Sequence, residues 1–188
     1  MILYPTETLY ALGVNALDES EYKKLNEAKG DRTGKFASWL VRNLQDIDRY
    51  GEVSEVAKKI AEAFLPGSLT LILPAKNAVP AFRSGDVNEV SFRISPDPVA
   101  SKLIGEFMAE HNAPLTCTSA NVSGAPTFST PSEILQQFGE KASMIDEIID
   151  DGPRKGLAST VVKVVGDEVT VIREGEISEA AIREAVHM

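Results

Sequence analysis

The chain has 188 residues, of which 43% are hydrophobic and 25% are charged, a balance typical of a soluble globular protein with one domain over residues 1–188. No apolar stretch approaches the roughly 20 residues that cross a bilayer, and Met1 is followed by Ile2 without a charged leader, so we expect a cytoplasmic protein with no membrane segment. Cys117 is the only cysteine, which excludes an intrachain disulfide, and the net charge of −9 opposes broad adhesion to nucleic acid.

Apolar strands and amphipathic helices alternate along the first half of the chain. The helix predicted at residues 53–64 places Val56 and Ile60 on one side and ends before Pro66-Gly67. The same periodicity predicts a helix at residues 20–28 and strands at residues 1–4, 36–41, 69–73 and 90–94.

The second half continues with a helix at residues 97–111 and ends with a hairpin and a helix. Gly166-Asp167 is a good two-residue turn between two β-branched runs. The predicted strands are 115–118, 144–149, 160–165 and 169–173, and the further helices are 131–138 and 178–186. This order indicates an α/β domain with a twisted, mixed sheet and flanking helices, but it does not give the strand order.

A first polar segment, residues 4–13, interrupts this pattern directly after a predicted strand. It carries the hydroxyls of Thr6 and Thr8 and the carboxylate of Glu7, and we interpret it as a loop that presents oxygens and amides to a polar ligand. An ordinary turn begun by Pro5 explains the same residues.

A second polar segment, residues 116–124, lies at the end of the strand predicted at 115–118 and contains Ser119 and Asn121. Small side chains let backbone N–H groups approach an anion closely, and hydroxyls add further donors. The phosphate-loop pattern GxxxxGK[ST] is absent, and a Ser/Asn-rich connector remains the alternative.

A third group combines Ser159 with Arg173, which the predicted hairpin makes neighbours. The planar guanidinium of Arg173 suits bidentate contact with a phosphate, although a surface arginine at a strand end is also ordinary. Lys29 and Arg32 end the first predicted helix, where favourable interaction with the helix dipole explains a lysine without any ligand.

Other enzyme classes have little support. His111 and His187 are the only histidines, and neither has an acidic constellation that indicates a metal centre or a Ser-His-Asp triad. Cys117 has no neighbouring base in the sequence, so we interpret it as a small buried hydrophobic residue.

Taken in order, these segments resemble the YrdC/TsaC family of threonylcarbamoyl-AMP synthases over nearly the whole chain. The resemblance implies an α/β fold whose twisted open sheet surrounds a deep, locally positive cavity. The motifs that carry it are YPTETLYALG at 4–13, Lys29 with Arg32, LPGSLTLIL at 65–73, SFRISP at 91–96, TSANVSG at 118–124, and ASTV at 158–161 before Arg173-Glu174-Gly175.

By the same resemblance, one end of the cavity holds L-threonine and the other holds ATP. The amine of threonine takes up bicarbonate as a carbamate, whose oxygen attacks the α-phosphate and expels pyrophosphate, so no protein nucleophile is expected. Mg²⁺ is expected with ATP, and a separate machinery that transfers the threonylcarbamoyl group to tRNA is the implied partner. The implied threonine-binding residues are Thr8, Arg93 and Ser159, and the implied ATP-binding residues are Lys29, Arg32, Ser119, Asn121 and Arg173.

The chain departs from the family pattern in two places. Members usually read Lys-x-Arg, whereas Lys29-Gly30-Asp31-Arg32 puts an acid at the arginine position, and we take Arg32 as the substitute. Only three residues precede Tyr4, so we expect the usual leading helix to be absent, as in a short, single-domain form. Two alternatives stay open, a family paralogue that keeps the cavity without the synthesis, and a module that binds RNA.

Overall fold

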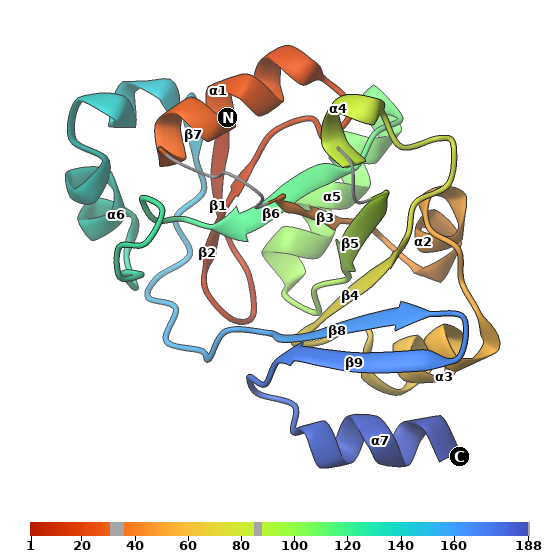
Figure 1. The fold of residues 1–188 in the computed structure, drawn as a ribbon. Helices are drawn as coiled ribbons and strands as arrows, with labels where there is room; N and C mark the ends of the chain where they lie inside the picture. Colours follow the sequence, from red (N-terminus) through yellow and green to blue (C-terminus); the bar gives the residue numbers. More distant parts are fainter. Residues whose placement is uncertain (31–35, 85–87, 188) are drawn as a thin grey trace.

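The computed structural model describes residues 1–30, 36–84 and 88–187, in which nine strands form one sheet (Figure 1). The strand order is β7-β1-β2-β6-β3-β5-β4-β8-β9. The pairs β1–β7, β3–β5 and β4–β8 are parallel and the other pairs are antiparallel, so the predicted mixed α/β sheet is confirmed. The strands are β1 (Ile2–Pro5), β2 (Tyr10–Gly13), β3 (Ser38–Leu40), β4 (Leu69–Pro74), β5 (Glu89–Arg93), β6 (Leu115–Ser119), β7 (Glu147–Ile148), β8 (Thr160–Val165) and β9 (Glu168–Arg173).

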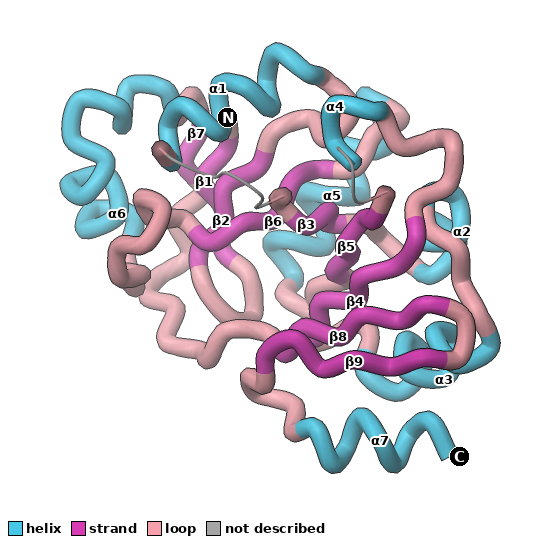
Figure 2. Tube along the Cα trace, viewed as in Figure 1, coloured by secondary structure: helices cyan, strands magenta, loops and turns pink. Residues whose placement is uncertain are grey.

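Helices surround the sheet, which runs through the middle of the molecule (Figure 2). Helix α5 packs against β1 and β6, and α3 packs against α7 and β4. None of the helices in the described part of the chain has the length and apolarity that a membrane crossing needs. The helices are α1 (Glu19–Lys29), α2 (Leu44–Tyr50), α3 (Glu55–Phe64), α4 (Ala81–Ser84), α5 (Pro98–His111), α6 (Pro131–Phe138), the 3₁₀ helix η2 (Gly139–Met144) and α7 (Glu179–His187).

Side-chain caps set the starts of helices α1 and α5. The carboxylate of Asp18 accepts hydrogen bonds from the first turn of α1, and that of Asp97 does the same for α5. Such caps satisfy N–H groups that have no partner inside a helix, each worth about 1 kcal/mol. Helix α1 begins at Glu19, one residue before the predicted start.

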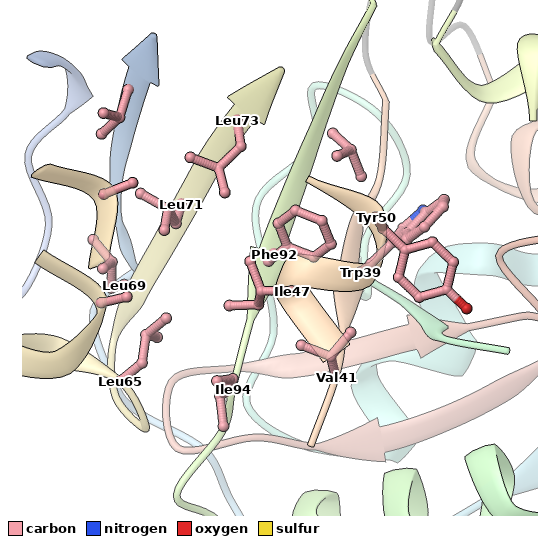
Figure 3. Packing of buried hydrophobic residues seen from close by; sticks show 14 of the residues in the cluster. Trp39, Val41, Ile47, Tyr50, Leu65, Leu69, Leu71, Leu73, Phe92 and Ile94 are labelled. Atoms are coloured by element: carbon pink, nitrogen blue, oxygen red, sulfur yellow. The ribbon is translucent and has the colours of Figure 1, made fainter. Parts of the chain in front are cut away.

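The largest apolar cluster lies between β3–β5–β4 and helices α2 and α3 (Figure 3). Trp39 meets Tyr50 edge to face with ring centroids 5.2 Å apart, and it meets Phe92 in the same manner at 6.2 Å. Aromatic pairs of this kind add about 0.5–1.5 kcal/mol each beyond the apolar area that they bury. They fix α2 on the sheet through Tyr50.

Several element predictions were wrong. Residues 10–13, predicted as loop, form strand β2, which pairs with both β1 and β6. Residues 144–149, predicted as one strand, contribute only the two residues of β7, because η2 extends to Met144. Helices α2 and α4 were not predicted at all.

Candidate active site

A cavity of about 360 Å³ opens over the sheet, between the β1–β2 turn and the β8–β9 hairpin. Its volume lies in the range of small-molecule sites. The charged residues among its described lining are two arginines, Arg93 and Arg173, and no aspartate or glutamate lines it there. The hydroxyl-bearing residues of the lining are Thr6, Thr8, Tyr10, Ser38, Thr70, Ser91, Thr118, Ser119, Thr127 and Ser159.

The turn at residues 6–9 brings Thr8 to the cavity. The Thr6 hydroxyl donates to the carbonyl of Leu9 at 2.6 Å and lies 3.2 Å from the Leu9 amide nitrogen and 3.3 Å from that of Thr8. These bonds fold the turn tightly. Thr8 is 1% exposed, and its hydroxyl lies 3.1 Å from that of Thr6. Sequence reasoning named Thr8 but missed the role of Thr6 in holding it.

Arg93, the last residue of β5, connects this turn to the centre of the sheet. One nitrogen of its buried guanidinium, Nη1, donates to the Thr8 hydroxyl at 3.2 Å, and Nη2 forms an ion pair with the Glu7 carboxylate. The second carboxylate oxygen of Glu7 accepts from the Ser95 hydroxyl. Sequence reasoning named the Glu7 carboxylate in this loop but gave it no partner and no role in binding.

Ser159 and Arg173 lie at the opposite side of the cavity. The Ser159 hydroxyl is buried and lies 2.8 Å from that of Thr70. Arg173 donates to the Ser159 carbonyl from Nη2 at 2.7 Å and from Nε at 3.2 Å, as expected for neighbours across the β8–β9 hairpin. Partial desolvation at the cavity, and then the positive charge of Arg93, lower the pKa of Arg173.

Lys29 lies beneath the loop that follows β6 and does not line the cavity. Its ammonium is 3% exposed and donates to the carbonyls of Ser119 at 2.5 Å and Asn121 at 2.7 Å. The Asn121 side chain folds the same loop by donating to the carbonyls of Val122 and Ala125. Ser119 lines the cavity and donates to the Asn121 amide oxygen at 2.6 Å.

Three further predictions concern the Arg32 substitution, the role of Cys117 and the absence of a metal centre. Arg32 and Asp31 lie outside the described residues. Cys117 lines the cavity but is only 7% exposed, and burial raises the pKa of its thiol, so the prediction of a small buried residue is confirmed. Among the described residues, no three His, Cys, Asp or Glu side chains gather to hold a metal.

Comparison with known proteins finds one family model and several related sequences. The Sua5/YciO/YrdC family model, described as "Telomere recombination", matches residues 1–175. A Methanocaldococcus jannaschii protein is 35% identical over 178 residues, which are 94% of this chain and 80% of that protein. The threonylcarbamoyl-AMP synthase of Pyrococcus abyssi is 32% identical over 188 residues, and the chain spans only 53% of its length.

Solved structures agree in fold. The crystal structure of P. abyssi Sua5 complexed with L-threonine matches with a TM-score of 0.86 and 31% identity, covering 98% of this chain and 53% of that one. The crystal structure of E. coli YciO matches with a TM-score of 0.83 and 27% identity, covering 96% of this chain and 85% of that one. The predicted twisted sheet of this fold is therefore confirmed.

Proposed function

The chain belongs to the Sua5/YciO/YrdC family, and from that membership we propose that it forms threonylcarbamoyl-AMP and pyrophosphate from L-threonine, bicarbonate and ATP. The product is the activated precursor of threonylcarbamoyladenosine in tRNA. Relatives named threonylcarbamoyl-AMP synthase, and a matching structure that holds L-threonine, support the proposal.

One observation carries the proposal, namely that a strongly acidic chain concentrates two arginines in a hydroxyl-rich cavity without a lining carboxylate among its described residues. Such a cavity selects anions, because their charge is neutralised and their oxygens find donors. L-threonine brings a carboxylate and ATP brings a triphosphate. Both ligands therefore match the donors that line this cavity.

In this proposal each end of the cavity has its own task. Arg93 and Thr8 bind the threonine carboxylate at the β1–β2 turn, and Ser159 reaches the threonine from the β8–β9 side of the cavity. Arg173 and Ser119 bind the phosphates of the magnesium complex of ATP, and Lys29 and Asn121 hold the loop that carries Ser119.

The chemistry needs positioning more than a protein nucleophile. The threonine amine and bicarbonate form a carbamate with loss of water, and a carbamate oxygen attacks the α-phosphorus. The bond from that phosphorus to the bridging oxygen breaks, and pyrophosphate leaves. Holding the two anions in line and neutralising the charge that develops supplies the acceleration. Mg²⁺ enters as part of the substrate and shields the triphosphate.

A second candidate is a family member that binds a nucleotide without this synthesis. The sequence observation that favours it is Asp31, an acid where the family usually has an arginine. The first candidate, the synthase, also implies two further proposals: a cytoplasmic location, and separate machinery that transfers the product to tRNA.

Formation of the product from ¹³C-labelled bicarbonate separates the two candidates. We expect mass spectrometry to find a threonyl adduct of AMP that carries one ¹³C atom and appears only when threonine and ATP are both present. ATP binding without any labelled adduct contradicts the synthase and favours the second candidate.

A further inference from the structure

We propose that Glu7 is a positioning residue, which fixes the guanidinium of Arg93 and neutralises its charge so that the threonine end accepts a single carboxylate. This inference rests on the proposed function. Glu7 does not line the cavity, so it acts through Arg93 and not by touching substrate.

The geometry ties Arg93 to one turn at two points. Glu7 accepts from Nη2 of Arg93, and the adjacent residue, Thr8, accepts from Nη1 at 3.2 Å. The second carboxylate oxygen of Glu7 accepts from Ser95, which follows β5. Both carboxylate oxygens therefore hold the end of β5 against the β1–β2 turn, and the plane of the guanidinium is set by residues of that turn.

Burial makes this pair different from a surface ion pair. The side chain of Arg93 is 9% exposed and that of Glu7 is 15% exposed. Removing one partner of such a pair leaves the other as an uncompensated charge in a poorly solvated place. Glu7 therefore controls both the orientation and the net charge of the group that meets the substrate.

The pair also distinguishes the two arginines of the cavity. Within the described residues, the hydrogen bonds of Arg173 go to the neutral oxygens of Ser159, whereas Arg93 carries a counter-ion. Arg173 is consequently the unbalanced cation, suited to a polyphosphate. The neutral Arg93–Glu7 pair suits an amino-acid carboxylate and disfavours a second multiply charged anion.

The change Glu7→Gln keeps the shape of the side chain and removes its charge. We expect the KM for threonine to rise about tenfold, because the guanidinium of Arg93 loses the charge-assisted hydrogen bond that orients it toward the substrate, while the KM for ATP stays within twofold. Pyrophosphate, which we expect to compete only with ATP in the wild type, should then also compete with threonine.

Steady-state pyrophosphate release from wild type, Glu7→Gln, Arg93→Gln and the double variant tests this coupling. If Glu7 acts through Arg93, adding Glu7→Gln to the Arg93→Gln variant does not raise the KM for threonine further. The matched control is Glu179→Gln, which breaks an exposed Glu–Arg pair on α7 and should change neither KM. Ser95→Ala removes only the hydrogen bond from Ser95 to Glu7 and should raise the KM for threonine two- to threefold. This milder variant keeps the inference testable if Glu7→Gln does not fold.

The outcomes separate this inference from the proposed function. If the wild type releases pyrophosphate with threonine but Glu7→Gln and Ser95→Ala keep its KM for threonine, the inference is overturned and the function stands. Equal losses for threonine and ATP, or additive effects in the double variant, also overturn it in favour of a purely structural role. A wild type without threonine-dependent release overturns both.

Discussion

Arg93 and Arg173 share one cavity but meet different surroundings, and this difference determines the anion that each one binds in the proposed reaction. Arg93 is buried against Glu7, whereas Arg173 lies at the exposed end of β9 and donates to Ser159. A guanidinium without an acidic partner retains its full attraction for phosphate. Arg173 is therefore the residue whose removal should affect ATP most.

We predict that Arg173→Ala raises the KM for ATP at least tenfold and leaves the KM for threonine within twofold. The loss corresponds to one hydrogen bond to a charged group, about 1.5–3 kcal/mol. Initial rates over a range of each substrate measure both constants. Arg183→Ala, which removes an exposed arginine on α7, is the control, and an unchanged KM for ATP in Arg173→Ala contradicts the assignment.

Sequence patterns predicted which residues line the cavity better than they predicted the hydrogen-bond and ion-pair partners of those residues. The motif residues Thr8, Arg93, Ser119, Ser159 and Arg173 all line it. The sequence showed the Glu7 carboxylate but not its partner, because Arg93 lies 86 positions away and only the folded sheet brings the two together. Lys29 stays a predicted phosphate-binding residue; within the described residues its ammonium donates to carbonyls about 90 positions further along the chain, contacts that the sequence did not predict.

At the scale of elements, the irregular segment at residues 150–158 connects β7 to β8 and packs against the β1–β2 turn. The amide of Gly156 donates to the Thr8 carbonyl at 3.0 Å, and Nε of Arg154 donates to the Thr6 carbonyl at 3.1 Å. Arg154 also pairs with Asp97, the cap of α5. The segment thus holds the turn in place and leads into Ser159.

The backbone of Gly156 lies close against the backbone of Thr8, and the substitution Gly156→Ala tests this contact. A Cβ atom there would lie 2.7 Å from the Thr8 carbonyl oxygen and 2.8 Å from the Thr8 Cα, so the segment or the turn must move. We predict a severalfold rise in the KM for threonine and a lower melting temperature.

The matched control for this substitution is Gly105→Ala within α5, where a Cβ meets nothing within 4 Å. Alanine is favoured over glycine in a helix by about 0.5–1 kcal/mol, so this variant should melt roughly 1–4 °C higher. Calorimetric melting of both variants and the two values of KM check the prediction. Equal behaviour of the two variants contradicts a tight contact at Gly156.

Asp146 joins α1 to the start of β7 and gives a prediction on pH. Hydrogen bonds from Lys24 and from the amine of Met1 lower the pKa of Asp146 to about 2. Since the pKa is depressed by folding, the stabilisation is complete above the unfolded pKa of about 3.9 and is lost as the pH falls toward 2. The carboxylate is largely exposed, so the contribution should stay below about 1 kcal/mol.

Accordingly, Asp146→Asn should be less stable than the wild type in urea at pH 6, and the difference should shrink as the pH falls below about 4 and be lost only below about pH 2. Asp167→Asn, in the exposed turn between β8 and β9, serves as control and should show no such convergence. A difference that is constant with pH contradicts the ion pairs as its cause.

Element predictions failed at short segments, where few residues carry a periodic signal. The four residues of β2 follow three polar side chains, which led to a loop assignment, but pairing with β1 and β6 on both edges overrides that local signal. Helix α2 has a single well-buried aliphatic residue, Ile47, and is fixed by Tyr50 against Trp39. Longer periodic elements such as α5 were predicted almost to the residue.

At the scale of the whole molecule, pairings between distant segments create the cavity. The hairpin β8–β9 joins the sheet through β4, and the β1–β2 hairpin joins it through β6. Neither neighbour can be inferred from local periodicity, so strand order was not predictable, although the family motifs implied a central cavity. The net charge of −9 and the arginines inside this cavity favour small anions over a long RNA as ligands.

The measurement that tests the central claim most directly is pyrophosphate release from the magnesium complex of ATP, with threonine and bicarbonate supplied together and each omitted in turn. The account predicts release that requires both and that falls at least tenfold in Arg173→Ala at subsaturating ATP. Release that is independent of threonine, or none from a folded protein that binds ATP, contradicts it.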